Sequence, residues 1–233
     1  MNQQDKYIIN ELRKEEAWRM FRIMSEFIEG FDTLAGLTPA VTVYGSARIL
    51  PEDPLFKMAE SLGRKLAKAG YAVITGGGPG IMEAVNKGAF EAGGTSVGLT
   101  IALPKEQPSN QYHTITLDFR HFFVRKVMLV KYATAFVLLP GGFGTLDELT
   151  ETVTLIHTHK IRPFPVFLMC GDYWQGLIDW MRDETAARHY IDRVDLNLLE
   201  IVDDPAEIVA KIDAWYRAKA HNHEKQAPLR APS

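Results

Sequence analysis

The stretch ATAFVLLPGGFGTLDELTETVTLIHT, residues 133–158, decides the fold class of this chain. It opens with an apolar run, passes through the glycine-rich turn PGGFG and continues into a segment where Leu146, Leu149 and Val153 recur at helical spacing. A buried strand that leads through a glycine turn into an amphipathic helix is the repeating unit of parallel βαβ sheets. The stretch therefore predicts an α/β protein.

The same order of elements recurs elsewhere in the chain. Residues 71–80 read YAVIT followed by GGGPG, and an amphipathic segment follows at once. The apolar runs are nearly continuous, as in strands that are covered on both faces. We therefore predict a three-layer, Rossmann-like, doubly wound parallel sheet. The expected strands are residues 40–44, 71–75, 95–101, 115–117, 133–139 and 165–169, and the expected helices are residues 56–69, 81–92, 124–132, 145–158, 173–187 and 205–218.

The predicted domain has an extension at each end. Residues 5–34 lack proline and carry regularly spaced apolar side chains, which predicts an extra N-terminal helix that packs on the core or on another subunit. Residues 221–233 are polar and contain proline, which favours a disordered tail. We expect one α/β domain over residues 1–220, of which residues 1–36 form the helical extension.

The composition excludes several classes of protein. The chain has 233 residues and a net charge of −3, which argues against nucleic acid as a partner. Cys170 is the single cysteine, so an internal disulfide or a multi-cysteine metal site is excluded. The N-terminal segment lacks the apolar region of a secretion signal, and no apolar run approaches the roughly 20 residues of a membrane span. We expect a cytoplasmic protein with no metal ion and no membrane partner.

Two glycine-rich turns, residues 76–80 and 140–144, each follow a predicted buried strand and open a predicted helix. Such a junction presents unpaired backbone N–H groups and the positive end of a helix dipole, which together favour an anion such as phosphate. Neither turn matches the P-loop or the G-x-G-x-x-G dinucleotide pattern. One such turn can serve packing alone, but two at the same edge of a sheet favour a ligand site.

Two acidic residues and a basic pair accompany these turns. Glu83 and Glu148 are each expected in the first helical turn, where a carboxylate can simply stabilise the helix by about 0.3–1 kcal/mol. For Glu83 this role and a functional one stay open, whereas for Glu148 we favour contact with the ribose of a nucleotide. Arg125 and Lys126 form a basic pair that is exposed if it stands alone, but an arginine beside a phosphate site is a natural clamp.

Three of these motifs together resemble the LOG (Lonely Guy) family. They are GGGPGIMEA at residues 76–84, the Arg125-Lys126 pair and PGGFGTLDE at residues 140–148, against a family signature of PGGxGTxxE with an upstream RK pair. The resemblance spans roughly residues 41–180, and YGSAR at residues 44–48 is similar to a longer bacterial branch. Phe122 stands where many members have Met. Members are cytokinin riboside 5′-monophosphate phosphoribohydrolases, and many carry the label "lysine decarboxylase-like".

The resemblance implies an activity and a set of site residues. The reaction would be hydrolysis of the N-glycosidic bond of AMP or an N6-substituted AMP, giving free base and ribose 5-phosphate, without a cofactor and in a homodimer or larger homo-oligomer. Arg125 and Glu148 correspond to the catalytic pair. The implied nucleotide-binding residues are Gly45, Ser46, Gly76, Gly77, Gly78, Gly80, Met82, Glu83, Lys126, Gly141, Gly142, Gly144 and Thr145.

Two other functions stay open at this point. The chain could bind AMP without cleaving it, as a sensor or carrier, although pure binding does not require the carboxylate of Glu148. It could also be a pyridoxal-phosphate decarboxylase, with Lys160 as the candidate lysine. The chain is short for the usual fold of such enzymes, and no other feature points to that cofactor.

Overall fold

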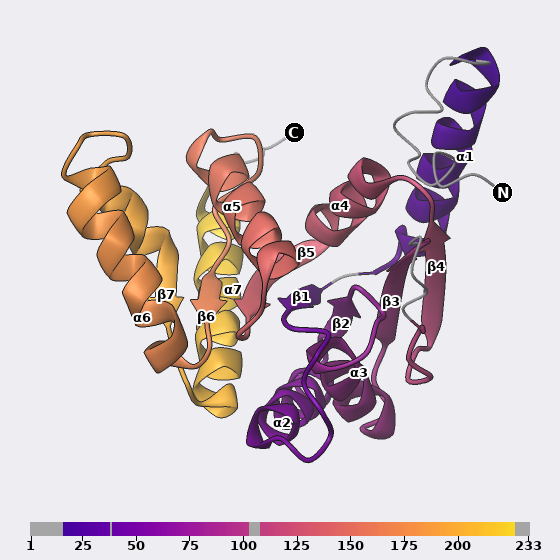
Figure 1. Cartoon of the computed structure of the whole chain (residues 1–233), viewed down its shortest axis with the longest axis horizontal. Helices are drawn as coiled ribbons and strands as arrows, with labels where there is room; N and C mark the ends of the chain where they lie inside the picture. The colour runs from indigo at the N-terminus through magenta and orange to yellow at the C-terminus, as the bar shows by residue number, and fades with distance from the viewer. Residues whose placement is uncertain (1–15, 38, 103–107, 227–233) are drawn as a thin grey trace, which may run out of the picture.

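The computed structural model describes residues 16–37, 39–102 and 108–226 (Figure 1). Within them a seven-stranded sheet has the order β4-β3-β2-β1-β5-β6-β7, and each neighbouring pair is parallel. The direction of winding reverses between β1 and β5, which makes this pair the topological switch point of the sheet. The strands are β1 Ala40–Tyr44, β2 Ala72–Thr75, β3 Ser96–Ile101, β4 Ile115–Phe119, β5 Ala133–Leu138, β6 Val166–Leu168 and β7 Leu199–Ile201.

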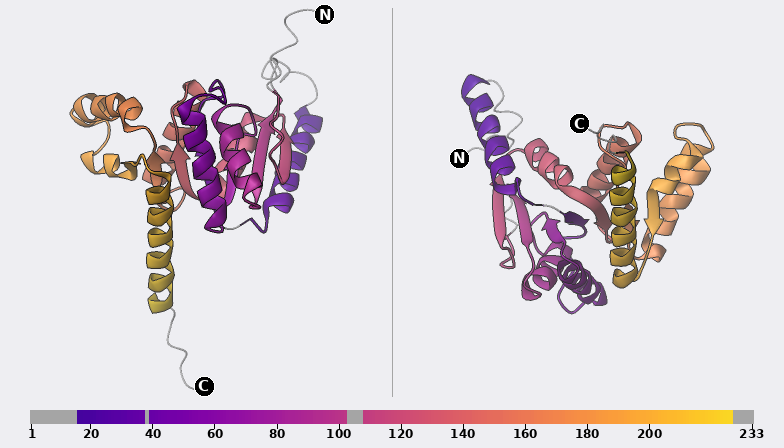
Figure 2. Two further views of the ribbon diagram at one scale, coloured as in Figure 1. Left: turned by 90° about the horizontal axis from the view of Figure 1, so that it is seen from below. Right: turned by 180° about the vertical axis from the view of Figure 1, so that it is seen from behind.

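Helices cover both faces of the sheet, which confirms the predicted three-layer fold (Figures 1 and 2). Buried side chains of α4, α5 and α6 pack on one face, and those of α2, α3 and α7 pack on the other. Successive strand residues alternate between the two cores, as Val73 and Ile74 do, because side chains of a strand point to opposite faces in turn. The helices are α1 Glu16–Leu34, α2 Pro54–Lys68, α3 Ile81–Glu91, α4 Phe122–Lys131, α5 Phe143–His157, α6 Gly171–Trp180 and α7 Pro205–Gln226.

Each predicted strand and helix is present among the described residues, and the differences lie mainly toward the C-terminus. Helix α6 continues into a π-helical segment, Met181–Ala186, and a 3₁₀ segment, Arg193–Leu198, leads into β7. The sequence did not predict β7, because three residues at a sheet edge are too short to show a strand pattern.

The boundary expected at residue 221 was wrong. Helix α7 runs to Gln226, beyond the body of the sheet (Figure 2). The segment HNHEKQ, residues 221–226, contains no glycine or proline to end a helix. The rest of the expected tail, residues 227–233, and residues 5–15 of the expected N-terminal helix lie outside the described residues.

Helix α1 rests on α4 of its own chain. Gly30 of α1 faces the side chain of Met128, and a Cβ atom on Gly30 would lie 2.7 Å from the Met128 Cε atom. Glu26 accepts hydrogen bonds from the backbone N–H groups of Arg120 and His121, at 3.2 and 3.3 Å, and its other carboxylate oxygen lies 3.0 Å from His121 Nδ1. Because no side chain of its own caps α4, Glu26 does so from the neighbouring helix.

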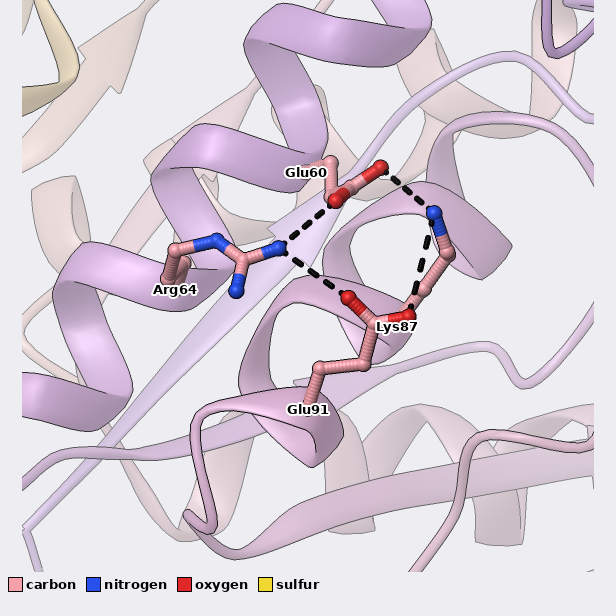
Figure 3. Close-up of polar contacts among 4 residues, drawn as sticks. All are labelled: Glu60, Arg64, Lys87 and Glu91. Atoms are coloured by element: carbon pink, nitrogen blue, oxygen red, sulfur yellow. Dashed lines mark hydrogen bonds and ion pairs between the residues drawn. The ribbon is translucent and has the colours of Figure 1, made fainter.

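Helices α2 and α3 cross in very close contact. An added Cβ atom on Gly63 would collide with the Val85 carbonyl oxygen, and one on Gly88 would collide with the Glu60 carbonyl oxygen. Around this crossing Arg64 and Lys87 each bridge the carboxylates of Glu60 and Glu91, at 2.7–3.9 Å (Figure 3). The crossing therefore holds α2 and α3 together, and the glycine turn of residues 76–80 leads directly into α3.

No described helix is both long enough and apolar enough to cross a membrane.

Candidate active site

Three loops meet at the carboxyl ends of β1, β2 and β5. Ser46, which follows β1, is the residue that joins them. Its backbone N–H donates to the carbonyl oxygen of Pro140 at 3.0 Å, and its own carbonyl oxygen accepts from the N–H of Ile81 at 2.9 Å. The turn after β1 therefore links the two glycine-rich turns at the switch point of the sheet, where open α/β sheets bind their ligands.

Glycine is required for this close approach. Gly80 has φ +70°, and an added Cβ atom would lie 2.5 Å from the Ser46 carbonyl oxygen. An added Cβ atom on Gly141 would collide with the side chain of Thr145. Both glycines therefore shape the junction by packing, because a side chain at either position would push the loops apart.

The loops enclose a cavity of about 750 Å³. That volume lies in the range of pockets that hold small ligands. The residues from the sequence-derived set that line it are Gly45, Ser46, Gly76, Met82, Arg125, Gly142, Gly144, Thr145 and Glu148. The structure thus brings the expected catalytic pair and parts of both glycine turns around one space.

Two helices begin at this cavity without a capping side chain. The N-cap residues Gly80 of α3 and Gly142 of α5 make no side-chain cap hydrogen bond, whereas Asp53 caps α2 by accepting from the N–H of Leu55 at 2.8 Å. The first backbone N–H groups of a helix have no acceptor within the helix, and without a capping side chain they can donate hydrogen bonds to a bound anion. The start of α5, which lines the cavity with Gly144 and Thr145, can accept a phosphate group.

Arg125 enters the cavity from α4. Its Nε donates to the carbonyl oxygen of Leu99 at 2.6 Å, and its Nη2 reaches the carbonyl oxygen of Gly76 at 3.4 Å. Burial lowers the pKa of the guanidinium, while the Glu148 carboxylate raises it, and an arginine stays charged in either case. The site therefore holds a positive charge that is oriented by two backbone carbonyl groups.

Glu148 is a buried carboxyl group that faces the same cavity. Burial raises its pKa to about 7, and Lys126 and Arg125 oppose that rise while Glu151 and Asp147 add to it. Arg125 favours the ionised form of this carboxyl group, but burial outweighs the influence of Arg125 on the pKa. Near neutral pH the group can thus either accept or donate a proton.

One sequence-based expectation about Glu148 was wrong. Helix α5 begins at Phe143, two residues before the expected start, so Glu148 lies in the second turn and no acidic residue lies in the first. Simple stabilisation of the helix N-terminus therefore explains Glu148 poorly, because that effect fades beyond the first turn. Glu83 does lie in the first turn of α3, where that role fits.

The remaining sequence-derived residues lie around the cavity but do not line it. They are Gly77, Gly78, Gly80, Glu83, Lys126 and Gly141. Lys126 forms ion pairs with Asp147 and Glu151, each at 2.9 Å, and so ties α4 to α5.

The structure adds residues that the sequence analysis did not select. Tyr44, Arg48, Phe122 and Phe143 line the cavity as well, and Phe143 is 92% exposed. Tyr44 ends the central strand and Arg48 follows it, so their places directly around the Gly45 turn were the available signal. Phe122 was noted in the sequence only as a departure from the family pattern, which did not predict that it lines the cavity.

The fold and the cavity define a Rossmann-like α/β protein with a ligand pocket at the switch point of its sheet. Within that class, this chain belongs to the LOG family. The family described as "Possible lysine decarboxylase" matches residues 82–212, more than half of the chain.

Named relatives support this assignment. A probable cytokinin riboside 5′-monophosphate phosphoribohydrolase of Oryza sativa, LOG4, is 30% identical over 163 residues, which cover 68% of this chain and 70% of that protein. The cytokinin riboside 5′-monophosphate phosphoribohydrolase of Mycobacterium marinum is 31% identical over 172 residues, covering 70% and 88%.

Solved structures show the same fold. The X-ray structure of TM1055 has 30% sequence identity and a TM-score of 0.57, and the alignment covers 76% of this chain and 99% of that one. The molybdenum cofactor binding protein of Rippkaea orientalis has 22% identity and a TM-score of 0.56, covering 76% and 97%, and shares the fold alone.

Proposed function

We propose that this protein hydrolyses the N-glycosidic bond of a purine nucleoside 5′-monophosphate, AMP or an N6-substituted AMP, to free base and ribose 5-phosphate. One observation carries the proposal: a buried carboxyl group, Glu148, and a fixed guanidinium, Arg125, face the same cavity as the uncapped start of α5. The names of the relatives support the same reaction.

Different residues of the cavity bind different parts of the substrate. The N–H groups at the start of α5 and the hydroxyl of Thr145 bind the 5′-phosphate. Glu148 contacts the ribose, and Arg125 clamps the nucleotide from the other side. Binding energy from the phosphate, which does not react, holds the sugar in place for the reaction.

The reaction passes through a sugar with a developing positive charge at the anomeric carbon. The bond from that carbon to the base nitrogen breaks, and its electron pair leaves with the base. Water forms the new bond to the carbon, Glu148 accepts a proton from that water, and the base gains a proton from solvent. An ionised Glu148 also stabilises the positive charge on the sugar as it develops.

Binding without turnover is the second candidate function. Structures with the same fold include molybdenum cofactor carrier proteins, but at 22% identity they carry no argument about the ligand of this chain. The pKa of Glu148, raised to about 7 by burial, favours catalysis over binding alone, because a carboxyl group with such a pKa can exchange a proton during the reaction near neutral pH.

We also propose that the described residues form one nucleotide-binding domain and that the protein assembles as a homodimer or larger homo-oligomer. On α1 the large apolar side chains of Trp18, Phe21, Met24 and Ile28 are exposed. Sedimentation of the whole chain at increasing concentration tests the assembly, and a monomer at all concentrations overturns it.

The activity test incubates the purified protein with AMP and with isopentenyl-AMP and detects free base by chromatography. We expect base release, and a loss of about 100-fold or more in kcat for Glu148→Gln. Tight AMP binding by calorimetry with turnover absent in the wild type would support binding alone. Base release that Glu148→Gln leaves unchanged would remove Glu148 from the mechanism.

A further inference from the structure

Tyr44 is the last residue of the central strand β1, and it lines the cavity beside Glu148. Its ring stacks on Phe136, with ring centroids 6.3 Å apart and planes 5° from parallel. The side chain is buried, and among the described residues its hydroxyl makes no hydrogen bond of normal geometry, with the hydroxyl of Thr152 as its near neighbour. A buried hydroxyl without a well-formed hydrogen bond destabilises the folded state, so its presence in this position suggests a functional role.

Two further polar side-chain atoms near Tyr44 are also buried without a hydrogen-bond partner. The Oε2 atom of Glu148 is buried and unpartnered in the described part of the chain, and so is the Oγ1 atom of Thr152. Glu148 and Thr152 are four residues apart on α5 and therefore lie on one face of the helix. Tyr44 and Glu148 line the same cavity, and Thr152 acts on Tyr44 through a side-chain contact that lowers its pKa, so the three groups are neighbours.

The chemistry of the three groups is complementary. Burial, followed by the carboxylates of Glu148 and Glu151, raises the pKa of Tyr44 well above its usual value, so the phenol remains a neutral donor. A carboxylate only accepts hydrogen bonds, and a threonine hydroxyl can do either. Glu148 also lines the cavity, so its carboxyl group borders the space in which a sugar would lie.

We propose that Tyr44 is a positioning residue for the hydrolysis: its hydroxyl, with that of Thr152 beside it, holds the buried oxygen of the Glu148 carboxylate so that the other oxygen faces the sugar. The inference rests on the proposed function and deepens it. The contact is made directly when substrate is bound, or through one water molecule, since hydrogen bonds at catalytic groups often tighten only in the complex.

The proposal has a defined consequence for proton affinity. The charged groups that act on Glu148 are Arg125 and Lys126 from α4 and Asp147 and Glu151 from α5, and Tyr44 is the neutral donor from β1. Donation to the ionised carboxylate favours its charged form. Loss of the Tyr44 hydroxyl therefore raises the pKa of Glu148, and the acidic limb of the rate profile moves to higher pH.

The test compares Tyr44→Phe with the wild type, using AMP as substrate. We expect kcat to fall about 10- to 100-fold with little change in KM, and the acidic limb to move upward. We also expect unchanged or higher thermal stability, because the substitution removes an unpaired buried hydroxyl and keeps the ring. Tyr132→Phe, on a tyrosine outside the cavity, is the matched control.

Thr152 supplies a second pair of variants should Tyr44→Phe fail to fold. Thr152→Val should reproduce the upward shift of the acidic limb, and Thr152→Ser should behave as the wild type, with Thr150→Val as the control on the exposed face of α5. Unchanged kcat and an unchanged acidic limb in both Tyr44→Phe and Thr152→Val overturn the inference.

A direct titration of the Glu148 carboxyl by carbon NMR separates the two proposals. A higher pKa in Tyr44→Phe supports the positioning contact even if the wild type releases no base, an outcome that overturns only the proposed function. An equal pKa in the two proteins, both free and in the presence of ribose 5-phosphate, overturns the contact whatever the activity.

Discussion

The side chain of Arg125 crosses from helix α4 to strand β3 and donates from Nε to the carbonyl oxygen of Leu99 at 2.6 Å. Leu99 lies within a strand that is itself buried in the sheet. The guanidinium is thus oriented by backbone rather than by another side chain. Because β3 is paired with a strand on each side, its backbone is held in place, and the positive charge has a fixed direction when a ligand arrives.

The first prediction concerns this contact. Arg125→Lys should lower kcat/KM for AMP about 100-fold or more, because one ammonium cannot bond Leu99 and clamp a nucleotide together. Base release under steady-state conditions measures the effect. Arg120→Lys is the control and should keep full activity, because Arg120 is exposed to solvent. Equal activity of the two variants would remove Arg125 from the site.

Gly76 lies directly against the same guanidinium, and an added Cβ atom would collide with Arg125 Nη2. Gly76→Ala should therefore displace Arg125 and lower kcat/KM, while the fold persists. Gly36→Ala is the control, because nothing lies within 4 Å of a Cβ atom there. The comparison uses kinetics with AMP and the circular dichroism spectrum. A fully active Gly76→Ala protein would show that Arg125 does not need its present position.

The pKa of Glu148 predicts a dependence of stability on pH. Because burial raises this pKa from 4.5 to about 7, the native state binds the proton more tightly than the unfolded state. The wild type should lose stability as pH rises from about 4.5 through about 7. Glu148→Gln removes that loss, so it should gain about 1–3 kcal/mol over the wild type at pH 8 and nothing at pH 4.

Urea denaturation at the two pH values measures this difference. Glu52→Gln, on the exposed loop before α2, is the control and should differ from the wild type equally at both. A gain for Glu148→Gln that is the same at both pH values would contradict the raised pKa.

The crossing of α2 and α3 predicts an unequal response of two helical glycines. Gly88→Ala should destabilise the protein by about 1–3 kcal/mol, because the new Cβ atom meets the backbone of Glu60 across the crossing. Gly176→Ala in α6 has free space and should be neutral or stabilising by up to about 1 kcal/mol, because alanine favours helix. Thermal unfolding of both variants provides the test, and equal effects would refute the close crossing.

The hydrogen bonds from Glu26 of α1 to the start of α4 predict that Glu26 holds the two helices together. Glu26→Gln weakens the cap on α4 and the contact with His121, so it should lower stability by about 1–2 kcal/mol and expose α1 to proteases. Limited proteolysis followed by mass spectrometry detects the cleavage. Glu29→Gln, one turn further along on the exposed face, should resist cleavage as the wild type does. Identical digestion of both variants would show that Glu26 does not hold the helix.

The sequence was sufficient to predict the fold class, because buried strands, glycine turns and amphipathic helices each leave a local pattern in the sequence. The apolar runs at residues 40–44 and 133–139 and the glycine turns that follow them predicted buried parallel strands at nearly their observed bounds. Helix ends were less certain, since a helix such as α5 can extend through Gly144 once tertiary contacts compensate for the glycine.

The sequence by itself also determined which residues to examine in the site, through the Arg125-Lys126 pair and the PGGFGT turn. Only the tertiary structure showed that the two basic residues have different roles. Arg125 enters the cavity, whereas Lys126 pairs with Asp147 and Glu151. Only the structure, likewise, set Tyr44 beside Glu148 and gave that carboxyl its raised pKa. The reason is physical, because burial and charge depend on neighbours that β1, α4 and α5 bring together from distant parts of the chain, and a pattern along the sequence does not contain them.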